Sequence, residues 1–134
     1  MRAEKAIRAL LVGSAGLTAL VPAESVWPGQ APQGASMPAI VVSTVSAGEL
    51  TTIDALAGYG LARARVSVVA LARDYASVKQ ILEQVRVACN YQRGTVGGVT
   101  VVSVIRDIYG PDDRDDDLGI FMQSLDFQVT YREP

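Results

Sequence analysis

The sequence of 134 residues predicts a single α+β domain, with a mostly antiparallel sheet of four strands and helices packed on one face of the sheet. Some segments carry apolar residues at helical spacing, four others carry the β-branched or alternating pattern of strands, and no repeat or linker divides the chain. The strands form two hairpin-like pairs on either side of the longer helix. This order favours antiparallel pairing around one core.

Helices are expected in three places. Residues 2–12 carry apolar side chains on one helical face, and a shorter helical piece is expected over 14–21, after Gly13. The longest helix follows Asp74, a good N-cap, and ends at Asn90. Apolar residues recur within it every three or four positions, which predicts that one face packs on the sheet.

Four strands are expected. The first covers 39–45, a β-branched apolar run, and it follows a stretch over 27–38 that holds too many Pro and Gly residues for regular structure. The segment 61–71 alternates small apolar residues with polar ones, which is typical of a half-buried strand. The other strands are expected over 99–108 and 119–131, and the last has one apolar and one polar face.

Two connections are expected to be surface loops. Residues 46–60 contain Gly, Ser, Thr and Ala and predict a long loop between two strands, a class that is often functional. Residues 110–118 join the last two strands and carry five aspartates, Asp112, Asp113, Asp115, Asp116 and Asp117. We expect a solvated acidic hairpin, with contact to a partner subunit as the alternative.

The composition excludes several function classes. The chain has no histidine, so it has no Ser-His or Cys-His pair and no imidazole ligand for zinc. Its formal charge of -2 gives no basic field for binding nucleic acid non-specifically. The single cysteine, Cys89, lies at the apolar end of a helical pattern and is expected to be a buried hydrophobic residue. We expect no cofactor and no enzymatic activity.

The sequence contains two candidate ligand-binding motifs, and neither has the residues at the spacing that its ligand requires. No register of the acidic cluster places a glycine at the sixth and a glutamate at the twelfth position of a calcium loop. The glycines over 94–98 lack the lysine of a phosphate loop and precede a strand, so they predict a turn. The N-terminal 23 residues imitate a secretory signal, but Glu4 and Gly13 interrupt the pattern, and the run is shorter than the ~20 apolar residues that span a bilayer. We expect neither secretion nor a membrane span.

The sequence offers several polar segments that could contact other chains and few residues that could perform chemistry, which favours a role in assembly. Arg63 and Arg65 lie on the polar face of a predicted strand, where they are candidates for contact with a neighbour's carboxylates. Together with the loops 46–60 and 110–118, they are the surfaces on which we expect a ring or stack of subunits to form.

Several segments, in order along the chain, resemble the tail completion, or tail terminator, proteins of long-tailed bacteriophages, prophages and gene-transfer particles. The order and spacing of the segments carry the resemblance, since none is specific alone. The segments are Ala6-Ile7-Arg8-Ala9-Leu10-Leu11, Gly16-Leu17-Thr18-Ala19-Leu20-Val21, Val26-Trp27-Pro28-Gly29, Ala31-Pro32-Gln33-Gly34, Met37-Pro38-Ala39-Ile40-Val41-Val42, Ala62-Arg63-Ala64-Arg65-Val66-Ser67-Val68, Asp74-Tyr75-Ala76, Arg93-Gly94-Thr95 and Ser124-Leu125-Asp126-Phe127-Gln128-Val129.

The resemblance implies a structural virion protein that assembles in the host cytoplasm into a homo-oligomeric, hexameric ring at the head-proximal end of the tail. Such a ring stops polymerisation of the tail tube protein and joins the tail to the head connector and adaptor proteins. DNA would pass through the lumen without sequence-specific binding. The family offers no catalytic residue to carry over.

Three other functions stay open at this point. The chain could be another neck or connector adaptor or another tail subunit, which would bind a different surface of the particle. The signal-like N-terminus is compatible with a small secreted binding module. An enzyme that uses carboxylates alone would need two acidic side chains to converge in a pocket.

Overall fold

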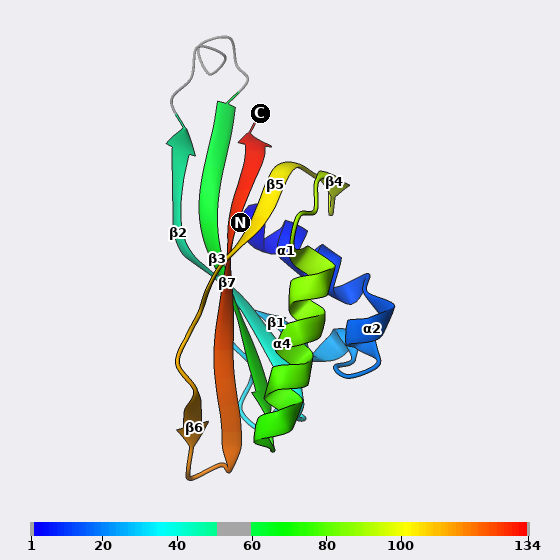
Figure 1. Cartoon of the computed structure of the whole chain (residues 1–134), viewed down its shortest axis with the longest axis vertical. Helices are drawn as coiled ribbons and strands as arrows, with labels where there is room; N and C mark the ends of the chain where they lie inside the picture. The colour runs from blue at the N-terminus through cyan, green and yellow to red at the C-terminus, as the bar shows by residue number, and fades with distance from the viewer. Residues whose placement is uncertain (1, 51–59, 134) are drawn as a thin grey trace.

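The computed structural model describes residues 2–50 and 60–133, and one mixed sheet with helices on one side dominates the fold (Figure 1). The bounds of the helices are α1, Arg2–Val12; α2, Ala15–Thr18; the 3₁₀ helix η1, Ala23–Ser25; and α4, Tyr75–Cys89. The strands are β1, Val26–Pro28; β2, Ala39–Leu50; β3, Gly60–Ala72; β4, Gly94–Val96; β5, Val99–Tyr109; β6, Asp113–Asp115; and β7, Ile120–Glu133. No helix in this part of the chain is long and apolar enough to cross a membrane.

The sheet is larger than the four antiparallel strands expected from the sequence. It has seven strands in the order β1-β2-β3-β7-β5-β4, with β6 beside β7, and β1 runs parallel to β2. The three additional strands have three residues each, too few to show an alternating pattern. Each exists because a long neighbouring strand offers it backbone partners, and β1 tolerates Pro28 because it lies at the edge of the sheet.

Both expected loops are partly strand. β2 continues to Leu50 and β3 begins at Gly60, with a register shift between Thr44 and Ser46. Pairing with β3 therefore outweighs the weak strand propensity of the Ser-Ala-Gly segment. The rest of the predicted 46–60 loop lies outside the described residues. In the predicted 110–118 loop, β6 pairs with β7 over Asp113–Asp115, so the acidic connection is an ordered hairpin.

The helices agree with the sequence in position. α1 covers the expected residues, and α4 begins after Asp74, whose side-chain oxygen accepts a hydrogen bond from the Ser77 amide at 2.8 Å. The piece expected over 14–21 is confirmed only as the short helix α2, and the Leu20 and Val21 amides both donate to the Leu17 carbonyl in the turn that follows it. All three α-helices lie on the same side of the sheet (Figure 1).

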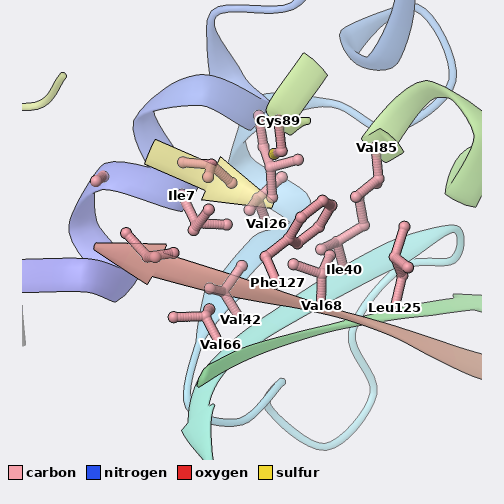
Figure 2. Packing of buried hydrophobic residues seen from close by; sticks show 14 of the residues in the cluster. Ile7, Val26, Ile40, Val42, Val66, Val68, Val85, Cys89, Leu125 and Phe127 are labelled. Atoms are coloured by element: carbon pink, nitrogen blue, oxygen red, sulfur yellow. The ribbon is translucent and has the colours of Figure 1, made fainter. Parts of the chain in front are cut away.

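The core lies between these helices and one face of the sheet. Alternate residues of β3 and β7 point into it, and Phe127 of β7 is enclosed by side chains from α1, α4, β2 and β3 (Figure 2). The inner face of β3 carries small side chains, so the helices can pack close to the sheet; these residues are Ala62, Ala64 and Ala70. The predicted alternation of both strands is confirmed, and it leaves their polar residues on the opposite face.

Candidate assembly surface

Arg65 lies on the face of the sheet that the helices do not cover. Its Nε and Nη2 atoms both lie 2.8 Å from the same oxygen, Asp126 Oδ2, on the neighbouring strand β7. Asp107 belongs to β5, the strand beyond β7, and its Oδ2 lies 3.6 Å from Arg65 Nε and accepts a hydrogen bond from Gln128 Nε2 at 3.0 Å. The guanidinium that was expected to meet a neighbour is thus bound within its own chain.

Asp126 depends on this arrangement. Only 10% of its side chain is exposed, and its second oxygen, Oδ1, is buried without a hydrogen-bond partner among the described residues. A buried carboxylate is costly unless a positive charge compensates it. Arg65 supplies that charge, so the first role of the ion pair is to stabilise the pairing of β3 with β7.

Arg63 is placed differently, although it is on the same face of the same strand. It is exposed, and its one contact in the described chain is a long hydrogen bond from Nε to Thr130 Oγ1, at 3.5 Å. None of the described carboxylates forms an ion pair with it. Of the two arginines predicted as partner contacts, Arg63 is therefore the one whose charge is not engaged by a carboxylate of the described chain.

The acidic hairpin is held to the body of the molecule at Asp112. Lys79 of α4 forms an ion pair with Asp112 Oδ1, and the Tyr75 hydroxyl donates to Asp112 Oδ2 at 3.2 Å. The hydrogen bond from Lys79 lowers the pKa of the Asp112 carboxyl, and the same bond raises the pKa of Lys79. On the next strand, the Arg114 guanidinium packs over the Phe121 ring.

The other aspartates of the hairpin divide into two groups. Asp115 turns inward, and its Oδ1 accepts hydrogen bonds from the amides of Asp117 and Leu118 at 3.1 and 3.2 Å. Asp113, Asp116 and Asp117 are exposed, and among the described residues only Asp116 has a cationic partner, Arg114, at 3.4 Å. The result is an ordered surface that projects negative charge, which we call the acidic tip (Asp113, Asp116 and Asp117).

The structure does not bring the predicted arginines and aspartates together within one chain. Arg63 is opposite Thr130 of β7, whereas Asp113 is opposite Met122. Eight residues of a strand separate these positions, about 27 Å at roughly 3.4 Å per residue. A contact between the two surfaces must therefore join two copies of the chain.

Sequence reasoning missed Asp107, Asp126 and Lys79 as partners in these networks. Asp126 was visible on the polar face of the last strand, but its position beside Arg65 depends on the register between β3 and β7, which alternation alone does not give. Asp107 reaches the site because the β5-β7 register shifts between Arg106 and Tyr109. Such an irregularity leaves no signal in a single sequence.

The described residues contain little that could perform chemistry. No group of three or more acidic or cysteine side chains in residues 2–50 and 60–133 could hold a metal ion. Cys89 is buried, as predicted, and desolvation raises the pKa of its thiol to about 12. The thiolate that would act as a nucleophile is thus strongly disfavoured at neutral pH.

Comparison with known proteins places the chain in a family. A family model described as tail completion protein gp17 matches residues 5–132. Among solved structures, the chain is similar to a chain in the virion of a native gene transfer agent particle, with a TM-score of 0.78 and 14% identity over 97% of this chain and 94% of that one. At this identity the likeness shows a shared fold, and no curated protein sequence matches. Because the family model covers nearly the whole chain, the chain belongs to the tail completion protein gp17 family and is a structural protein of a phage-type tail.

Proposed function

We propose that the chain forms a hexameric ring at the head-proximal end of the tail tube, where it stops tube polymerisation and joins the tail to the head connector. The observation that carries this proposal is the match of the tail completion family to residues 5–132. The likeness to a chain of a gene transfer agent virion supports it, because that likeness spans 97% of this chain. The protein would assemble in the host cytoplasm and remain in the virion.

The chemistry of the described residues fits a role without catalysis. On the open sheet face, Arg65 is engaged with Asp126 and Asp107, and the thiol of Cys89 is buried. The formal charge of -2 suits a ring through which DNA passes without being held by its phosphates. We propose that no cofactor takes part.

We assign the acidic tip to contact with another protein of the tail. Lys79 and Tyr75 hold Asp112, which directly precedes the tip, and β6 pairs with β7 across it, so little conformational entropy is lost when a partner binds the tip. The predicted contact between Arg63 or Arg65 and a neighbour's aspartates requires copies that meet end to end, because the two surfaces lie at opposite ends of the sheet. Arg63 is the better candidate, since Arg65 is bound to Asp126.

Polymerisation of purified tail-tube subunits tests this function. Added in small amounts, the protein should shorten the tubes, and the length distribution should narrow as its concentration rises. The triple variant Asp113→Asn, Asp116→Asn, Asp117→Asn should fold normally and bind tubes more weakly at low salt. Glu24→Gln, which removes an exposed carboxylate elsewhere, is the control.

The same assay separates the proposed function from a neighbouring one. A connector adaptor would leave tube length unchanged and would bind the portal side of the particle. Tubes that grow to the same length with and without the protein would therefore refute termination.

A further inference from the structure

One end of the sheet has two open edges. Beyond Val42, no strand of the described residues lies on the outer side of β2, because β1 pairs with it only over Ile40–Val42. At the other side of the sheet, β4 pairs only with β5. Figure 1 shows β2 and β4 on opposite sides of the upper part of the molecule, with β3, β7 and β5 between them. We call residues 46–49 the β2 edge and Gly94–Val96 the β4 edge.

The molecule closes other edge positions with its own groups. Glu4 Oε1 accepts from the Thr44 amide at 2.8 Å, just before the β2 edge begins. Along β5, Asn90 Oδ1 accepts from the Arg106 amide at 3.0 Å, and the Tyr91 amide donates to the Val104 carbonyl at 2.8 Å. Exposed strand edges are normally protected in this way, or by lysine and proline, because they bind other strands.

Among residues 2–50 and 60–133, no group from another segment bonds to the outer side of the β2 edge, and the edge contains no lysine or proline. Its residues are Ser46, Ala47, Gly48 and Glu49, and all of them are exposed. The small side chains leave room for another backbone, and a methyl group built at Gly48 meets nothing within 4 Å. With respect to the described part of the chain, this edge is therefore sterically open to a further strand.

The two edges carry opposite charges. Glu49 is the one charged residue of the β2 edge, and Arg93 directly precedes the β4 edge. Both side chains are exposed, and neither has an ion-pair partner among the described residues. Within one chain the edges are separated by four interstrand spacings, about 19 Å along the sheet at ~4.8 Å each.

We propose that the β2 edge of one copy pairs with the β4 edge of the next copy, with Glu49 close to the neighbour's Arg93. This inference rests on the ring of the proposed function and names its lateral contact. The two edges are different surfaces on opposite sides of one sheet, so the contact is heterologous and repeats from copy to copy. Such a contact closes into a ring when its rotation divides the circle.

Cysteine cross-linking on capped tubes tests this pairing. Gly48 is opposite Arg63, and Thr95 is opposite Thr100, so both positions lie on the face away from the helices. The variant Gly48→Cys, Thr95→Cys should give a ladder of covalent oligomers after mild oxidation, whereas the distance within a chain is too long for a disulfide. The native Cys89 is buried and should not contribute.

The matched control carries Gly48→Cys with Val87→Cys, an exposed position on α4 away from both edges. It should form at least tenfold fewer cross-linked oligomers. Glu49→Arg should weaken association about tenfold at low salt, and adding Arg93→Glu to it should restore the ladder, because each pair then has opposite charges again.

The outcomes separate this inference from the proposed function. Rings on tubes without a ladder above the control would overturn the edge pairing and leave the capping function standing. Absence of rings on the tubes would overturn both.

Discussion

Arg65 is predicted to stabilise the fold of its own chain, and Arg65→Gln tests this. The variant leaves the Asp126 carboxylate, 10% exposed, without its compensating charge. Removing one partner of a buried ion pair costs about 3–5 kcal/mol, and because Arg65 is 37% exposed we lower the expected loss to about 2–3 kcal/mol. For 134 residues, an unfolding entropy of about 2.1 cal/mol/K per residue converts this loss to a fall in Tm of about 7–11 °C.

Thermal unfolding followed by circular dichroism measures the effect. Arg63→Gln is the matched control, because it removes the same charge from the same face of β3 but only a 3.5 Å contact. We expect it to lower the free energy of unfolding by less than about 0.5 kcal/mol. The double variant Arg65→Gln, Asp126→Asn should recover at least half of the lost Tm, since no uncompensated buried charge remains. Equal shifts in Arg65→Gln and Arg63→Gln would refute the argument.

Three further predictions concern single features of the fold. Cys89 should resist alkylation at pH 8 in the native protein and react fully in denaturant, because burial raises its pKa to about 12; rapid native labelling would contradict this. The Lys79 hydrogen bond lowers the pKa of Asp112, so the contribution of this carboxylate to stability is present at neutral pH and is lost as the pH falls below about 4. An NMR titration of Asp112 should show a midpoint below 3.8, and in Lys79→Met the midpoint should rise toward 3.8. Gly97→Ala should lower the free energy of unfolding, measured with denaturant, by at least about 1 kcal/mol more than Gly98→Ala does. Both glycines have positive φ, but only a Cβ at Gly97 would lie 3.1 Å from Ala9 Cβ. Equal losses in the two variants would argue against this close packing.

The sequence predicted the elements whose pattern is local. α4 was expected from Asp74 to Asn90 because an N-cap and a full set of apolar positions lie within one segment. The long strands β3 and β7 were expected from their alternation, which fixes the inward and outward faces. These signals require no knowledge of distant parts of the chain.

The features that the sequence missed depend on pairing between distant segments. β1, β4 and β6 are strands because β2, β5 and β7 lie beside them, and the strand over 46–50 persists through pairing with β3 despite its Ser-Ala-Gly composition. For the same reason, the bond between Arg65 and Asp126 within one chain was not predicted, and the expectation that Arg65 contacts a partner subunit stays a prediction. Cross-strand contacts of this kind follow from register, which one sequence does not specify.

Electron cryomicroscopy of tail tubes polymerised with this protein tests the central claim most directly. We predict a ring of copies of this chain on one end of each tube, and on particles with heads, at the end that meets the connector. Bare tube ends, with the protein elsewhere on the particle or absent from it, would contradict the account.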